Sequence, residues 1–130
     1  IYFIFQNTPK FFEHPRVKYI ETTVDSFYKA KFINSCDAML HCRFEGESFG
    51  QACAEFSVMN KPVITWFGSF ERNHINYLQE KGIYYNNDFE LTNILKTFKP
   101  IKNKDLNCYK KHTPETAMMF FKKLLIDKVS

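Results

Sequence analysis

"FGQACAEFSVMNKPVITW", residues 49–66, decides the fold class. Its first part repeats apolar residues every three or four positions, which is the spacing of one helical face. Asn60 and Pro62 then end the helix, because asparagine tolerates the left-handed cap conformation and proline cannot continue a helix. The apolar, β-branched run at 62–66 is typical of a buried strand. A helix that leads into a buried strand predicts an α/β protein with a parallel sheet.

Strand-like and helical patterns alternate along the rest of the chain. Further strands are predicted at residues 1–5, 17–20, 37–42 and 82–86. Further helices are predicted at residues 23–35, 73–81, 88–98 and from Pro114 onward, with residues 99–108 as a solvated connector. We therefore expect one Rossmann-like domain over residues 1–130, with three α/β/α layers and about five parallel strands in the order 2-1-3-4-5, plus a C-terminal helix.

The crossover between the first two strands is the weak point of this prediction. Its sequence, "QNTPKFFEHPR" at residues 6–16, contains two prolines and cannot hold a long helix. The last helix places Phe121, Leu124 and Leu125 on one face, which we interpret as core or as a docking face for a partner domain.

Composition excludes several classes of protein. With 45% hydrophobic and 25% charged residues, the chain can bury a core and is not expected to be disordered. It contains no apolar run near the roughly 20 residues that span a bilayer, and no signal-peptide pattern, so we expect a cytoplasmic protein without a membrane span. The net charge of +4 comes mostly from scattered lysines, which predicts no nucleic-acid partner. The four cysteines show no metal-type spacing, which predicts reduced thiols and no metal site.

The loop after the third predicted strand, residues 42–50, is the candidate site. In doubly wound sheets the ligand crevice lies beyond the carboxyl ends of the strands, where the winding direction reverses. That reversal is expected here between the first and third strands. A helix that begins after this loop points its free amides into the crevice and suits a phosphate group. These amides belong to Phe49, Gly50, Gln51 and Ala52.

Two carboxylates flank this predicted phosphate site. Glu47 precedes the turn, and Glu55 lies more than one helical turn inside the helix. At about 1.5 Å of rise per residue, their carboxylates are expected on the order of 10 Å apart, which exceeds the spacing of a retaining glycosidase pair. The arrangement suits a nucleotide-sugar, with the ribose diol at Glu55 and the donor-sugar hydroxyls at Glu47.

The stretch "EGESFGQACAEFSVMNKPVIT" resembles the signature of retaining glycosyltransferases of the GT-B fold and family 4 ("glycosyl transferases group 1") type. That signature reads roughly E-x-F-G-x-x-x-x-E, followed by P-V-I/V. The matching residues are Glu47, Phe49, Gly50, Glu55, Pro62, Val63 and Ile64, and "NSCDAMLHC" at 34–42 resembles the strand that leads into the motif.

The resemblance implies a role for each matching residue. Glu47 would be the catalytic residue that contacts the donor sugar, and Glu55 would bind the ribose. The amides of Phe49 and Gly50 would lie against sugar and phosphate, and those of Gln51 and Ala52 against phosphate. The resemblance further implies a nucleotide-sugar donor, an unknown acceptor, no other cofactor and no obligatory metal.

The chain departs from the family pattern in its charges and in its extent. Family members carry an upstream Arg and Lys that neutralise the diphosphate, so we expect Arg43 or Arg72 to supply part of that charge. His41-Cys42 replaces the usual Pro-Ser, and "WFGSFERNH" replaces a Gly-Gly-x-x-E turn. The chain is therefore expected to be the donor-binding part of a longer two-domain enzyme, with an N-terminal acceptor domain outside it.

Simpler interpretations stand beside these. Glu47 could be a surface acid at a helix N-terminus, Gly50 a packing glycine and Arg43 a solvated loop residue. His41 is more easily a hydrogen-bonded histidine at the sheet edge than a general base, and His74 is expected to cap a helix.

Two other functions compete with glycosyl transfer. A non-catalytic domain that keeps the fold as an interaction scaffold predicts that Glu47→Ala and Glu55→Ala leave the function intact. A phosphoacceptor domain of the response-regulator type is disfavoured, because Gln6 and Cys42 stand where acidic residues are needed.

Overall fold

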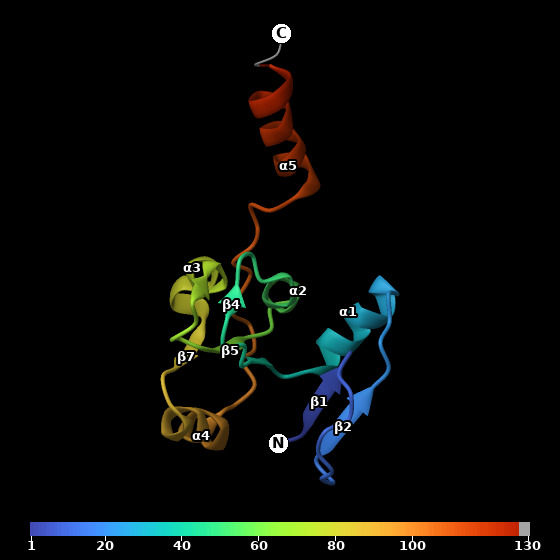
Figure 1. Ribbon diagram of the computed structural model, residues 1–130, viewed down its shortest axis with the longest axis vertical. Coiled ribbons are helices and arrows are strands. Elements are labelled where there is room, and N and C mark those ends of the chain that lie inside the picture. Colours follow the sequence, from blue (N-terminus) through green and yellow to red (C-terminus); the bar gives the residue numbers. More distant parts are fainter. Residues whose placement is uncertain (128–130) are drawn as a thin grey trace.

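The computed structural model describes residues 1–127 and shows a mixed α/β protein in which every strand pair is parallel (Figure 1). Three small sheets are present among these residues. The first pairs β1 (Phe3–Gln6) with β2 (Val17–Ile20); the second has the order β3 (Met39–His41), β5 (Val63–Trp66), β7 (Ile83–Tyr85); the third pairs β4 (Gly46–Glu47) with β6 (Glu71–Arg72).

The prediction of one five-stranded sheet in the order 2-1-3-4-5 is wrong. The expected neighbours 2-1 and 3-4-5 exist as β1–β2 and β3–β5–β7, but no ladder joins β1 to β3 in the described chain. Parallel sheets are stable when helices cover both faces. The segment that connects β1 to β2 contains Pro9 and Pro15 and forms no helix, so the strand pair lacks that cover.

An aromatic cluster packs on the β1–β2 pair in place of a helix. The ring of Phe5 lies 5.5 Å from that of Tyr19 and 5.2 Å from that of Phe11, measured between centroids. The Tyr19 hydroxyl donates to the carbonyl of Phe12 at 3.1 Å. No residue of either strand is fully buried. This strand pair therefore lies outside the main hydrophobic core.

The helices follow the sequence prediction closely. They are α1 (Ser26–Ser35), α2 (Gln51–Val58), α3 (Asn73–Leu78) with the 3-10 turn η1 (Gln79–Lys81), α4 (Asp88–Thr97), and α5 (Pro114–Phe121) with the π-helical turn η2 (Lys122–Ile126). Side-chain caps explain three of the starts. Asp25 accepts from the amides of the first turn of α1, Asn87 caps α4, and Thr113 caps α5 just before its proline.

The core lies around β5 and α2. Val63 and Ile64 of β5 are 1% and 2% exposed, and Cys53 of α2 is fully buried. The predicted solvated connector at 99–108 is partly wrong, because its end folds back into this core. The Ser57 hydroxyl donates to the Leu106 carbonyl at 2.7 Å, and Leu106 is 3% exposed.

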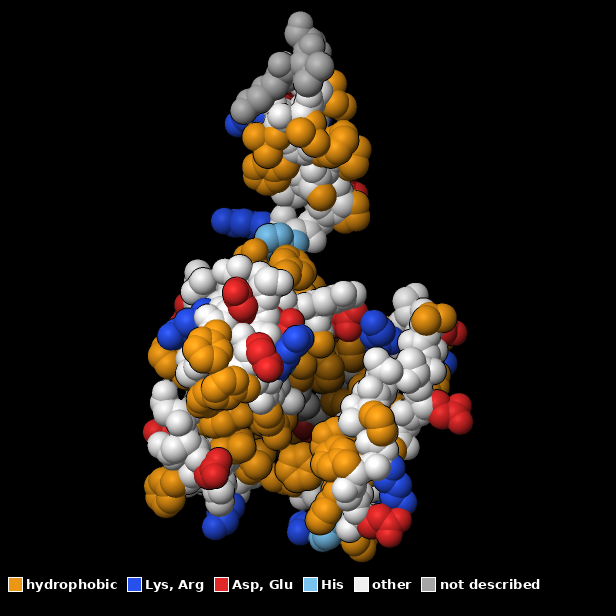
Figure 2. Space-filling view, in the orientation of Figure 1, with side chains coloured by type: hydrophobic (Ala, Val, Ile, Leu, Met, Phe, Trp, Pro, Cys, Tyr) orange, Lys and Arg blue, Asp and Glu red, His pale blue; other side chains and the backbone are white. Residues whose placement is uncertain are grey.

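Helix α5 stands apart from the rest of the molecule, at the end of an extended segment (Figure 1). Its apolar side chains, including Phe121 and those of Leu124 and Leu125 in η2, are about half exposed, and Figure 2 shows them on its surface. The helix is therefore not part of the core. Among residues 1–127, no helix is both long and apolar enough to cross a membrane.

Candidate functional site

Two glycines shape the loop between β3 and α2. Gly46 and Gly50 have φ angles of 77° and 79°, in the left-handed region that glycine adopts readily. A Cβ on Gly46 would lie 1.9 Å from the Glu71 carbonyl oxygen, and one on Gly50 would lie 2.8 Å from the Cβ of His74. The loop is thus pressed against β6 and α3. Gly50 is required by its backbone conformation and by this close packing.

Helix α2 begins directly after Gly50, and no side chain caps its first amides. Gln51 and Ala52, the first two residues of the helix, are exposed. The first-turn amides of a helix have no partner within it and carry the positive end of its dipole. An anion can therefore reach this end of α2.

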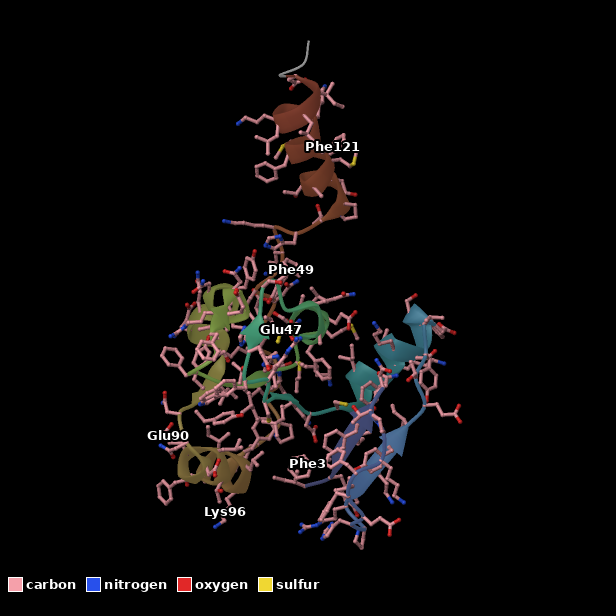
Figure 3. The ribbon with its side chains drawn as sticks, viewed as in Figure 1. Phe3, Glu47, Phe49, Glu90, Lys96 and Phe121 are labelled. Atoms are coloured by element: carbon pink, nitrogen blue, oxygen red, sulfur yellow. The ribbon has the colours of Figure 1, made fainter. Side chains whose placement is uncertain are left out.

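Phe49 faces an aromatic cluster. Its ring lies 5.5 Å from Tyr77, 5.4 Å from Tyr109 and 5.3 Å from His112, between centroids. Its carbonyl accepts a hydrogen bond of 3.0 Å from the Tyr109 hydroxyl. In Figure 3 it lies where the chain leaves toward α5. The structure thus gives the Phe49 side chain a packing role that fixes the turn.

The Glu47 carboxylate is held by two side chains from the end of β3 and the loop that follows. Its Oε1 lies 3.3 Å from Nε2 of His41 and 3.3 Å from Nη1 of Arg43. The Glu47 side chain is 24% exposed, whereas that of Arg43 is 59% exposed. Glu47 is therefore a partly buried acid with defined partners, which a plain surface acid is not. Arg43 places a positive charge beside Glu47.

The Glu55 carboxylate turns toward α1. Its Oε1 lies 2.8 Å from Nζ of Lys29 and accepts a weaker contact from Nε2 of Gln51 at 3.4 Å. Sequence analysis missed Lys29, because a contact between residues 26 positions apart depends on how α1 packs on α2. The structure thus places a lysine of α1 beside the Glu55 carboxylate.

Two buried histidines lie behind Glu47. Nδ1 of His41 lies 3.0 Å from the Thr65 hydroxyl, which lies 3.2 Å from Nε2 of His74. Both ring nitrogens of His41 have partners, in agreement with the simpler interpretation. The predicted cap role of His74 is wrong, since it is the second residue of α3 and fully buried. Burial, followed by the neighbouring His41, lowers the pKa of His74, and the backbone of Glu47 acts in the opposite direction.

Cys53 of α2 is a buried thiol near Glu47. Burial, reinforced by the charge of Glu47, raises the pKa of Cys53 to about 12. A protonated thiol of this kind is inert. All four cysteines are free, as expected for reduced thiols, but only Cys53 is fully buried.

Open cavities lie elsewhere on the molecule. One of about 410 Å³ lies between the β1–β2 pair and α4, where Phe3 and Lys96 line it (Figure 3). None of the predicted site residues lines this cavity. Among residues 1–127, no group of three or more His, Cys, Asp and Glu side chains could hold a metal ion. The candidate site is thus an exposed helix end flanked by two acids.

No protein-family model, curated protein or solved structure matches this chain. The motif and its geometry therefore carry the evidence for function. In that geometry, a carboxylate, an uncapped helix N-terminus and a second carboxylate follow one another from β4 into α2. Such an arrangement can bind an anion and hydroxyl groups on both sides of it.

Proposed function

We propose that this chain is the donor-binding domain of a retaining glycosyltransferase of the GT-B type, with a Rossmann-like arrangement of its strands. Its ligand is a nucleoside-diphosphate sugar, and the acceptor is bound by an N-terminal domain outside this chain. The observation that carries the proposal is the left-handed Gly50 at the uncapped start of α2, with Glu47 before it and Glu55 within the helix.

Each part of the donor has a partner in this arrangement. The diphosphate lies against the amides of Gln51 and Ala52, where the helix dipole favours negative charge. Glu47 accepts hydrogen bonds from the sugar hydroxyls, and Glu55 accepts them from the ribose diol. Arg43, which contacts Glu47, and Lys29, which contacts Glu55, supply the positive charge that the diphosphate needs.

Catalysis in this proposal is mainly electrostatic. Departure of the nucleoside diphosphate leaves negative charge on the phosphate oxygens, and the amides of α2 and the two cations stabilise it as it develops. Glu47 orients the sugar while its bond to the diphosphate breaks. The free thiols of the chain agree with a cytoplasmic enzyme, which we include in the proposal.

Thermal shift with uridine, guanosine and adenosine diphosphates and their sugars tests this function. We expect one base series to raise the melting temperature in a saturable way, because a ligand that binds only the folded protein stabilises it. Glu55→Gln should weaken that effect and Glu90→Gln, a matched change on α4, should not. If no series shifts the melting temperature at millimolar concentration, the proposal fails.

A scaffold role is the second candidate, and one observation favours it. Both carboxylates already have cationic partners within the protein, Lys29 for Glu55 and Arg43 for Glu47. Acids that only stabilise the fold need no ligand. This alternative predicts that Glu47→Ala and Glu55→Ala lower stability without changing any partner interaction, which a binding assay with the two variants would decide.

A further inference from the structure

A chain of hydrogen-bonding groups runs from the site into the core. It joins the Glu47 carboxylate to His41, His41 to the Thr65 hydroxyl, and Thr65 to His74, with separations of 3.3, 3.0 and 3.2 Å. Thr65 and His74 are fully buried, and His41 is 6% exposed. Thr65 is the register partner of His41 across β3 and β5, so the backbone ladder fixes the two side chains beside each other.

The proton positions in this chain follow from its chemistry. An ionised carboxylate only accepts hydrogen bonds, so Glu47 favours the His41 tautomer that carries its proton on Nε2. In a neutral ring, Nδ1 of His41 is then an acceptor and takes the single hydroxyl proton of Thr65. The Thr65 oxygen in turn accepts from Nε2 of His74, which leaves Nδ1 of His74 without a proton.

The opposite arrangement of protons, in which His41 donates to Thr65 and Thr65 donates to His74, is unfavourable at both the His41 end and the His74 end. It requires either a bare His41 nitrogen against the carboxylate or a second proton on the buried His41 ring, a charge that only the Glu47 carboxylate would offset. It also places a proton on Nδ1 of His74, which is buried and whose contact with the Glu47 backbone does not reach hydrogen-bond geometry. An unsatisfied buried donor is costly.

His74 is held firmly in the place that this chain needs. Its Cβ lies against the Gly50 turn, and its ring centroid is 4.8 Å from that of His41. The preceding residue, Asn73, donates to the Ser48 carbonyl at 2.7 Å. The start of α3 is therefore joined directly to the loop that carries Glu47.

We propose that His74 is a positioning residue for Glu47: through Thr65 it fixes the proton of His41 on Nε2, and this proton holds the Glu47 carboxylate in its place. The charged and titratable groups around these four residues include Arg43, Cys53 and Tyr109 beside Glu47, and Arg72 beside His74. The proton arrangement stands on geometry alone. Its consequence for the donor sugar rests on the proposed function.

Nitrogen NMR of the histidine-labelled protein at about pH 8 tests the arrangement directly, because the protonated and bare nitrogens of a neutral imidazole differ strongly in chemical shift. We expect the proton on Nε2 in both His41 and His74. Thr65→Val should abolish the single His41 tautomer, and Thr65→Ser, which keeps the hydroxyl, should restore it. A proton on Nδ1 of either ring, or a doubly protonated His41, overturns the proposal.

A second pair of variants covers the case in which Thr65→Val does not fold. His74→Gln keeps a side-chain N–H donor and should preserve the His41 tautomer, whereas His74→Leu removes the donor and should not. If His41 keeps one tautomer in both folded variants, His74 has no positioning role.

Donor binding then separates this proposal from the proposed function. If the wild type binds a nucleoside-diphosphate sugar, Thr65→Val should weaken binding about tenfold, with Thr65→Ser near wild type. In a Glu47→Gln background the same change should have little further effect. Binding that is unchanged in Thr65→Val contradicts the positioning role, whereas absence of binding in the wild type contradicts only the proposed function.

Discussion

The strand pair β1–β2 and the strand β5 have similar sequence patterns but different positions in the structure. Both are short parallel elements rich in apolar residues. Ile4 in the middle of β1 is 41% exposed, whereas Ile64 in the middle of β5 is 2% exposed. The difference comes from what packs on the strands: Cys53 of α2, Leu78 of α3 and Tyr109 form a buried cluster with Val63 of β5, whereas the cluster on β1–β2 is formed by the aromatic rings of Phe5, Phe11 and Tyr19. Parallel pairing alone does not make a core.

The largest expected effect compares the same substitution in these two strands. Ile64→Ala should lower the free energy of unfolding by about 2–5 kcal/mol, because it leaves a cavity among packed neighbours. Ile4→Ala, the matched control, should cost about 1 kcal/mol or less, because the side chain is partly exposed. Urea denaturation measures both. Equal costs would show that β1 is as well packed in solution as β5.

Gly50→Ala tests the turn that connects this core to the site. The added Cβ would meet His74 at 2.8 Å while the backbone keeps a positive φ, so we expect a loss of about 1–3 kcal/mol. Ser48→Ala, in the same loop and exposed, should stay within about 0.5 kcal/mol of wild type. Chemical denaturation of the two variants is the measurement. A stable Gly50→Ala protein would mean that the turn does not need glycine.

The Lys29–Glu55 pair connects the two regions, since α1 follows β2 and α2 precedes β5. Lys29→Met should cost about 0.5–1 kcal/mol, an effect that salt reduces. Lys10→Met removes the exposed Lys10–Glu13 pair in the N-terminal region and should cost about 0.3 kcal/mol or less. Thermal melts at low and high salt compare them. A larger effect for Lys10→Met would contradict the assignment of Lys29 to a partly buried contact.

A smaller effect concerns pH. Because the pKa of His74 is lowered in the folded protein, the unfolded chain binds more protons below the ordinary value of about 6.5. The contribution of His74 is therefore fully present above that value and is lost as pH falls below it. His74→Gln should flatten this part of the stability profile, whereas His14→Gln in the exposed N-terminal loop should not. A profile that stays steep in His74→Gln would assign the dependence to other groups.

Local sequence patterns predict individual helices and strands better than they predict which strands pair. The helix and strand of residues 49–66 were predicted to within two residues at each end, because local periodicity and the stop at Asn60 and Pro62 agree with the tertiary structure. The separation of β1 from β3 was not predicted, because pairing between distant strands leaves no mark in either strand. The two-residue strands β4 and β6 are too short for any periodicity.

The residues of the candidate site likewise fall into those that the sequence motif indicated and those that it did not. The motif indicated Glu47, Gly50 and Glu55 in chain order, and the structure places Gly50 at the helix start with the acids before and after it. Lys29, Thr65 and His74 were missed as neighbours of these residues, because each comes from another element. The prediction that His74 caps a helix was wrong. The local sequence around Asn73 does not distinguish a capping histidine from one that is buried inside the first turn.

The most direct test of the central claim is amide NMR of the isotope-labelled protein during titration with a nucleoside-diphosphate sugar. The account predicts saturable shifts at the amides of Gly50, Gln51 and Ala52, together with Glu47 and Glu55. Saturable shifts confined to other residues, such as those around Phe3 and Lys96, or no shifts at millimolar ligand, would contradict it.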